Sequence, residues 1–145
     1  MLAFLAYAPV TVTSAVTRVG VIGIISEVTR IFGEASKRVS TGALNKLLGD
    51  IVTRQPPPSG PAGRHVRLYY ATQASVRPPT FFVSTNHATD IGHSYRRFLV
   101  NQLRKTYGFD GTPVRLVFRA HAQKKRGGSA AAVAVKKGKK RARSR

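Results

Sequence analysis

The stretch SYRRFLVNQLRKTYGFDGTPVRLVF, Ser94–Phe118, decides the fold because it contains a helix, a turn and a strand in one run. Tyr95, Leu99 and Leu103 recur at the spacing that places side chains on one face of an α-helix. The same pattern begins slightly earlier in the chain, so the helix is expected over residues 90–107. It predicts a helix that buries one face and exposes the other.

The turn and the strand follow directly. Gly108 and Gly111 interrupt the helical pattern, since glycine weakens a helix interior and permits tight turns. Val114, Leu116 and Phe118 then alternate with other residues, as apolar side chains do on one face of a strand. The stretch therefore predicts a helix that a short turn joins to a strand.

Further elements are expected upstream of this stretch. Apolar residues at helical spacing predict one helix over Val21–Lys37 and a second helix that Ser40 or Thr41 caps. The second helix ends before the prolines at 56–58, since proline lacks the amide hydrogen that a helix needs. The strands expected in this part are Ala8–Thr13, His65–Ala74 and a strand that begins at Thr80.

The order of these elements predicts the fold class. From Ser40 onward it is helix–strand–strand–helix–strand, a small α+β domain in which two helices cover one face of a three-stranded sheet. We expect three regions: a strand and a helix in residues 1–39, the α+β domain in residues 40–122, and a basic tail in residues 123–145. The tail has no acidic or aromatic residue, so it cannot offset the entropy of ordering, and we expect it to be disordered.

Basic residues dominate the charge of the chain. Its 25 lysines and arginines against 5 acidic residues give a formal net charge of +20. Such an excess favours a polyanionic partner, and nucleic acid is the first choice because binding releases condensed counterions. An anionic membrane surface is the second choice. No segment is long and apolar enough to span a bilayer, and the apolar start lacks the features of a signal peptide, so the cytoplasm is the expected compartment.

Candidate contacts for a polyanion lie on the domain and the tail. Four basic residues share the outward face of the helix over residues 90–107, where a merely solvated face is the competing interpretation. Four others lie on the neighbouring strands and turn. Among the aromatic residues, only Tyr69 occupies a strand position that the alternation places on the outward face, where its ring is available to stack on bases. The basic candidates are Arg96, Arg97, Arg104 and Lys105 on the helix, Arg67, Arg77, Arg115 and Arg119 on the strands and turn, and Lys124, Lys125 and Arg126 in the tail.

Metal-binding and catalytic motifs are missing from the sequence. His65, His87, His93 and His121 have neither metal-ligand spacing nor cysteines or carboxylates nearby, and surface or loop positions are the simpler interpretation. Gly20–Gly23 resembles a phosphate-binding turn, but no Gly-Lys-Ser/Thr follows it. We therefore expect no catalytic residue, no metal site and no cofactor in this chain.

Several segments together resemble one protein family. They are LNKLL, RLYYATQ, PPTFFV and the stretch Ser94–Phe118, which is the most specific of them. From about Tyr7 to Arg119 the chain resembles the C-terminal part of Der (EngA), the tandem-GTPase family of bacterial large-subunit ribosome assembly. The resemblance implies a KH-like domain that follows the end of the second GTPase domain.

The resemblance also accounts for the first part of the chain. It implies that YAPVTVTSAVT contains the last strand of the GTPase domain, that Ser14 and Ala15 form its final guanine-contacting element, and that Val21–Lys37 is its last helix. The family usually has glycine where Arg18 stands. Its phosphate-binding loops would lie upstream of Met1, so the chain is expected to be a fragment.

Ribosome biogenesis is the function that the resemblance implies. The KH-like domain would bind rRNA of the large ribosomal subunit, while GTP and Mg²⁺ would bind the missing GTPase domains of the intact protein, which are a further expected partner. The chain alone is then expected neither to bind GTP tightly nor to hydrolyse it. The residues leave an alternative open, a standalone non-catalytic interaction protein that packs against a GTPase domain through its apolar strand and helix. Salt-dependent RNA binding would distinguish the rRNA-binding domain from this interaction protein.

Overall fold

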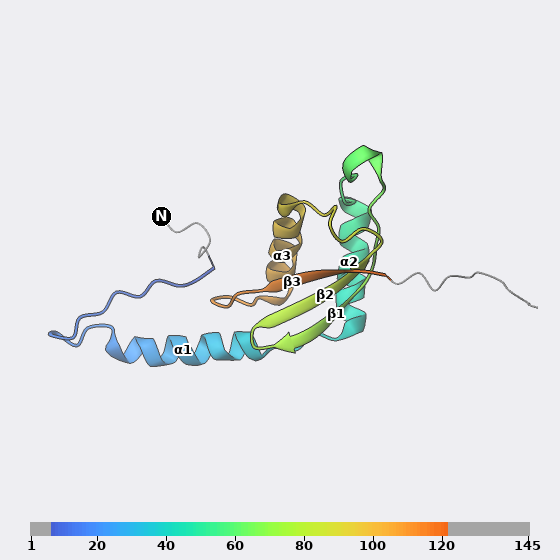
Figure 1. Ribbon diagram of the computed structural model, residues 1–145. Helices are drawn as coiled ribbons and strands as arrows, with labels where there is room; N and C mark the ends of the chain where they lie inside the picture. Colours follow the sequence, from blue (N-terminus) through green and yellow to red (C-terminus); the bar gives the residue numbers. More distant parts are fainter. Residues whose placement is uncertain (1–6, 122–145) are drawn as a thin grey trace, which may run out of the picture.

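The computed structural model describes residues 7–121 (Figure 1). The expected α+β class is confirmed, and so is the order of elements from Ser40 onward. Within the described range, no helix combines the length and the hydropathy needed to cross a bilayer. The elements are α1 (Val21–Ser36), α2 (Thr41–Arg54), the short 3₁₀-helix η2 (Pro61–Gly63), β1 (Leu68–Val76), β2 (Pro79–Thr85), α3 (His93–Tyr107) and β3 (Arg115–Ala120).

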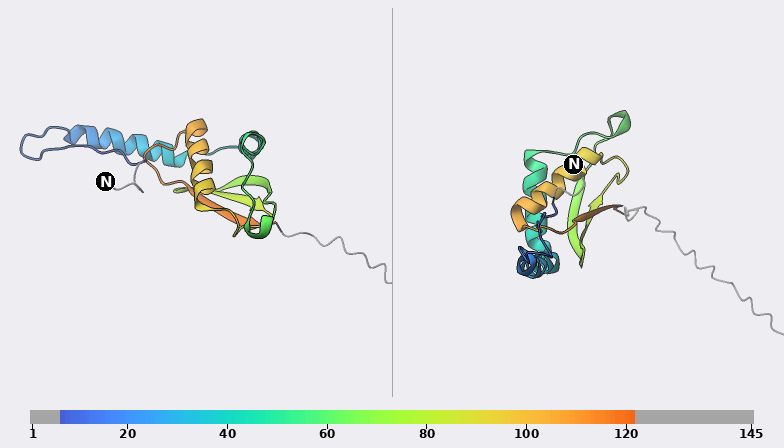
Figure 2. Two further views of the ribbon diagram at one scale, coloured as in Figure 1. Left: turned by 90° about the horizontal axis from the view of Figure 1, so that it is seen from above. Right: turned by 90° about the vertical axis from the view of Figure 1, so that its left-hand side faces the viewer.

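The core lies between the sheet and two helices. α2 and α3 cover the same face of the sheet, as the sequence predicted (Figures 1 and 2). Each helix buries residues three or four positions apart, so the apolar periodicity of each helix determines which side it turns to the strands. The buried apolar residues are Leu44, Leu48 and Ile51 of α2, Tyr95, Leu99 and Leu103 of α3, Ala71, Phe81 and Val83 of the sheet, and Val66, Ile91 and Phe109 of the connecting segments.

Local hydrogen bonds fix both ends of α2. Ser40 is the N-cap that the sequence predicted, because its Oγ accepts a hydrogen bond from the Ala43 amide at 3.3 Å. At the other end, the Tyr95 hydroxyl donates to the Gln55 carbonyl at 2.9 Å. Burial raises the pKa of Tyr95 to about 12, so the hydroxyl keeps its proton for this bond. The bond ties the end of α2 to α3.

β2 is the central strand of the sheet. It pairs antiparallel with β1 and parallel with β3. A register irregularity in β1 lies between Leu68 and Tyr70, and one extra residue in a strand shifts the side-chain alternation. Tyr69 and Tyr70 are therefore both exposed, by 45% and 48%. The expectation that Tyr70 shares the inward face with Val66 and Leu68 is wrong for this reason.

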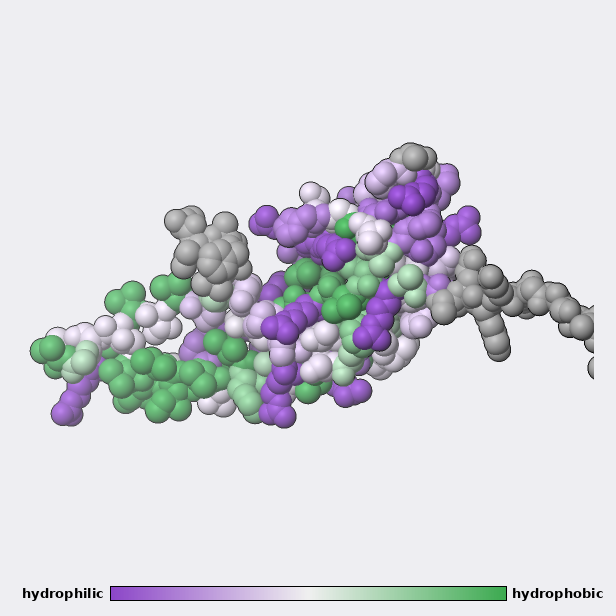
Figure 3. Space-filling model, in the orientation of Figure 1, coloured by the Kyte–Doolittle hydropathy of each residue, from purple (hydrophilic) through white to green (hydrophobic). Residues whose placement is uncertain are grey.

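Residues 7–36 form an arm that extends from the domain (Figures 1 and 2). α1 has no buried residue, and residues 7–20 run alongside it. The strand expected over Ala8–Thr13 is not formed, because within the described residues no other strand lies beside it to complete its hydrogen bonds. Val10 and Val12 in this segment are 91% and 86% exposed. Figure 3 shows that the arm is predominantly hydrophobic.

Polar contacts at the end of α1 attach the arm to the domain. Glu34 Oε2 accepts a hydrogen bond from the Phe109 amide at 2.8 Å, and Lys37 Nζ lies 2.6 Å from Glu34 Oε1. The hydrogen bond from Lys37 holds the pKa of Glu34 below its usual range. The buried Gln73 adds two bonds, from its Nε2 to the Lys37 carbonyl at 2.9 Å and from the Val39 amide to its Oε1 at 2.7 Å. These bonds fix the direction in which the arm leaves the domain.

The substitution Glu34→Gln is expected to weaken this attachment in a pH-dependent way. Because the folded-state pKa of Glu34 is lowered, its charge stabilises the fold above the unfolded value, and this contribution is lost as the pH falls through the folded value. At pH 7 the variant should lose about 0.5–1 kcal/mol of unfolding free energy, since the amide keeps the bond to Phe109 but not the ion pair. In urea unfolding the difference should shrink steadily as the pH is lowered below about 4.5. A difference that does not change with pH would contradict the role of the charge.

Candidate nucleic-acid interface

The face of the sheet opposite α2 and α3 is free of helices within the described residues (Figure 2). Strand pairing identifies its side chains, because residues paired with Thr80, Phe82 and Ser84 of β2 point to the same side as these three. We call this surface the open sheet face. Its residues are Tyr70, Thr72 and Ser75 of β1, Thr80, Phe82 and Ser84 of β2, and Arg115, Val117 and Arg119 of β3.

Two arginines of β3 supply the positive charge of the open sheet face. Arg115 and Arg119 are exposed, and four residues along a strand separate them by about 13 Å. The Arg119 guanidinium lies over the Phe82 ring, 3.7 Å from the ring centroid. This cation–π contact holds the charge in place at the surface. An extended polynucleotide lying along β3 would meet both charges.

Aromatic rings gather at one end of the open sheet face. The His121 imidazole lies 5.1 Å from the Tyr69 ring and 6.3 Å from the Tyr70 ring, measured between centroids. His121 Nδ1 is 3.3 Å from Ser84 Oγ, and its amide donates to the Thr85 carbonyl at 2.6 Å, which extends the pairing of β3 with β2. Exposed rings on a sheet are surfaces on which unpaired bases stack.

Acidic residues do not compensate the charge of this surface. The five acids are Glu27, Glu34, Asp50, Asp90 and Asp110. Glu27, Glu34 and Asp90 each pair with a basic side chain. Asp50 lies on α2, and Asp110 lies in the turn between α3 and β3. No carboxylate therefore belongs to the open sheet face, and an RNA phosphate can supply the missing negative charge.

Arg104, one of the four basic candidates on α3, is bound within the domain. Its guanidinium donates to the carbonyls of Phe109 and Thr112, both at 2.6 Å, and lies over the Tyr7 ring at 4.9 Å. Phe109 and Thr112 are buried, and burial lowers the pKa of Arg104. The side chain holds the turn between α3 and β3.

The other three candidates on α3 differ in exposure. Arg96 donates to the carbonyls of Ile91 and Ala88 at 3.0 and 3.2 Å, so it ties the helix to the segment before it. Arg97 and Lys105 are exposed. The structure thus leaves two of the four charges of this helix face at the surface, on the side of the sheet away from the open sheet face.

The remaining candidates lie in different places. Arg67 is exposed just before β1. Arg77 lies in the turn between β1 and β2, with its guanidinium 5.2 Å from the centroid of the Phe32 ring in the arm. The tail candidates Lys124, Lys125 and Arg126 lie outside the described residues.

Ser14 and Ala15, the expected guanine-contacting element, lie at a turn in the arm. Ser14 Oγ accepts a hydrogen bond from the Thr17 amide at 3.2 Å. Arg18 has a φ of 59°, in the left-handed region that glycine adopts most easily.

Sequence reasoning missed Tyr70 and His121 as parts of the candidate interface. Tyr70 was missed because the bulge in β1 is invisible in the alternation of apolar residues. His121 was interpreted as a surface histidine because no metal-ligand spacing surrounds it. Its position directly after the strand PVRLVFRA was the available indication, since a residue there extends the strand and lies beside Thr85, the last residue of β2.

The fold and this surface define the chain as a KH-like α+β domain with an attached arm. Residues 38–119 match the family described as "KH-domain-like of EngA bacterial GTPase enzymes, C-terminal", and the chain belongs to that family. It is 46% identical to GTPase Der of Moorella thermoacetica over 118 residues, which cover 81% of this chain and 27% of that protein.

Two further relatives carry the same name. GTPase Der of Syntrophobacter fumaroxidans is 42% identical over 116 residues, 80% of this chain and 26% of that protein. GTPase Der of Chloroflexus aggregans is 40% identical over 121 residues, 83% of this chain and 27% of that protein. The chain therefore spans about a quarter of the length of the curated relatives it matches.

Proposed function

We propose that this chain is the rRNA-binding module of a Der-type GTPase, docks on the large ribosomal subunit and acts in ribosome biogenesis in the cytoplasm. GTP and Mg²⁺ binding, and GTP hydrolysis, belong to a part of the intact protein outside this chain. The arm belongs to the end of the adjoining GTPase domain, with Ser14 and Ala15 as its guanine-contacting element, so the position of the module on RNA is linked to that domain.

The open sheet face is the observation that carries this proposal. It combines two exposed arginines with aromatic rings at one end, and no carboxylate belongs to it. Arginine contacts to phosphates supply affinity, and rings supply stacking surfaces for unpaired bases. Arg67 adds positive charge beside it, and Arg97 and Lys105 add weaker long-range attraction from the α3 side of the domain.

Competition binding tests this function. The full chain is titrated with large-subunit rRNA and with bulk transfer RNA at 0.1 and 0.3 M salt. We expect the affinity for both to fall with salt and the preference for large-subunit rRNA to persist. Deletion of residues 123–145 should lower both affinities by a similar factor, because lysines and arginines in a tail bind any RNA. Equal affinity for the two RNAs at both salt concentrations would contradict the proposal.

A second function, packing against a GTPase domain without RNA, is favoured by the arm. Large apolar side chains project from it into solvent, and exposed apolar surface of this extent marks an interaction site. Binding to a GTPase domain that does not weaken with salt, together with no affinity for RNA, would favour this function alone. The exposed side chains are Val10, Val12, Val16, Val19, Val21, Ile22, Ile24, Ile25, Val28 and Phe32.

A further inference from the structure

A depression of about 480 Å³ lies where β1 begins and where β2 and β3 end. It adjoins the aromatic end of the open sheet face, because His121 lines it and the His121 ring lies 6.3 Å from the ring of Tyr70, a residue of that face. No carboxylate lines it. The lining residues are His65, Arg67, Tyr69, Asn86, His87 and His121.

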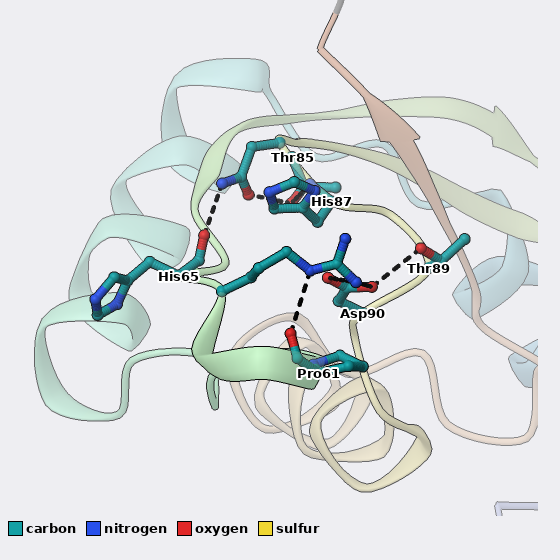
Figure 4. A network of polar contacts seen from close by, with 8 residues as sticks. Pro61, His65, Thr85, His87, Thr89 and Asp90 are labelled. Atoms are coloured by element: carbon teal, nitrogen blue, oxygen red, sulfur yellow. Dashed lines mark hydrogen bonds and ion pairs between the residues drawn. The ribbon is translucent and has the colours of Figure 1, made fainter.

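Asn86 gives the depression a fixed rim. Its Nδ2 donates to the His65 carbonyl at 2.7 Å, and its Oδ1 accepts from the Arg67 amide at 2.7 Å. These bonds use the backbone of the two residues. Within residues 7–121, the Arg67 guanidinium and the His87 imidazole have no hydrogen-bond partner of their own. Both are therefore free to bind a ligand, whereas the His65 ring points away from His87 (Figure 4).

The carboxylate that follows His87 in the chain is already compensated. Asp90 lies 3.3 Å from the Arg64 guanidinium and accepts a hydrogen bond from the Thr89 hydroxyl at 3.1 Å (Figure 4). Its side chain is only 5% exposed. The charged and titratable groups around the depression are thus Arg67, Tyr69, the three histidines and this Arg64–Asp90 pair. Of these residue types, only histidine ordinarily changes its charge between pH 5 and 8.

We propose that the depression binds a phosphodiester group of single-stranded RNA, and binds it more tightly when His87 and His121 are protonated. This inference deepens the RNA-binding function proposed above and rests on it. Arg67 supplies a constant positive charge, the two imidazoles supply a charge that depends on pH, and the ring of Tyr69 stacks on an adjoining base. RNA binding at this end of the sheet then responds to pH, while lysine and arginine contacts elsewhere do not.

The test compares the full chain with the variant His87→Gln/His121→Gln. Each is titrated with a fluorescent ten-nucleotide single-stranded RNA at pH 6 and pH 8 and at equal ionic strength. The parent should bind about tenfold more tightly at pH 6, because up to two added charges each form a salt-sensitive phosphate contact. In the variant the change should be less than about twofold. His93→Gln is the matched control, since it removes an exposed histidine that is not part of the depression, and it should keep the tenfold change.

Equal pH dependence in the double variant and the parent would overturn the inference. Inorganic phosphate that replaces chloride at equal ionic strength should compete for the depression and reduce the pH dependence of the parent, while the double variant should not change; a parent whose pH dependence phosphate does not reduce would also overturn the inference. A parent that shows no preference for large-subunit rRNA at either pH contradicts the proposed function itself. A preference that is retained but does not depend on the two histidines contradicts only this inference.

Discussion

Replacing Arg115 and Arg119 by glutamine is expected to lower the affinity for large-subunit rRNA about 30-fold at 0.1 M salt. Each phosphate contact contributes about 0.7–0.9 to the slope of log affinity against log salt, so the loss of two contacts flattens the slope by about 1.4–1.8. If the counterion contribution vanishes near 1 M salt, this slope corresponds to about 25- to 60-fold at 0.1 M. Fluorescence anisotropy over a range of salt concentrations measures both quantities.

Arg97→Gln/Lys105→Gln is the matched control for this variant. It removes the same charge from exposed positions on α3, which covers the other face of the sheet. We expect it to lower the affinity by no more than about threefold, because more distant charges act only through screened attraction. All four side chains are exposed, so both variants should unfold within about 0.5 kcal/mol of the parent. Equal losses of affinity would show that RNA responds to net charge rather than to the open sheet face.

Arg104→Met should have the largest effect on stability, about 3 kcal/mol of unfolding free energy. The substitution removes two hydrogen bonds from a charged donor, each worth about 1.5–3 kcal/mol, and leaves the carbonyls of Phe109 and Thr112 without this partner. Methionine retains the apolar part of the side chain, so the loss reports chiefly on the hydrogen bonds. Chemical unfolding followed by circular dichroism measures it.

Lys105→Met is the neighbouring control, because Lys105 is exposed on the same helix. It should change the unfolding free energy by less than about 0.5 kcal/mol. At a temperature where Arg104→Met is folded, that variant should bind large-subunit rRNA as the parent does. If Arg104→Met is as stable as the parent but binds RNA more weakly, Arg104 contacts phosphate. That result would contradict its role in the turn.

The periodicity of apolar residues, together with the glycines and prolines that end elements, is sufficient to predict most of the fold. The apolar spacing in α2 and α3 and the alternation in β3 identify both the elements and the faces that they bury. Apart from the strand expected over Ala8–Thr13, which is not formed, the differences are at the ends of elements, where tertiary bonds decide. The strand expected from His65 begins at Leu68, after a segment whose backbone Asn86 binds. The helix expected from Asp90 begins at His93, because Gly92 before it has an extended backbone and is the N-cap.

The candidate site was less predictable, because it depends on neighbours that are distant in sequence. A helical projection gives the direction of Arg96 and Arg104 but not the carbonyls that bind them. The exposure of Tyr70 follows from a bulge that alternation does not reveal. The apolar spacing of α1 is typical of a core helix. Within the described residues, however, no element covers its apolar face, so these side chains stay exposed.

Ultraviolet cross-linking of the full chain to large-subunit rRNA, with the linked peptides identified by mass spectrometry, tests the role of the open sheet face most directly. Aromatic side chains that stack on bases cross-link efficiently, so the proposed interface should yield links in β1 at Tyr69 and Tyr70 and at His121 after β3. The links should disappear in the Arg115→Gln/Arg119→Gln variant at 0.3 M salt. Links confined to α3 or to the tail, with none in β1 or after β3, would contradict the assignment of the open sheet face as the RNA-binding surface.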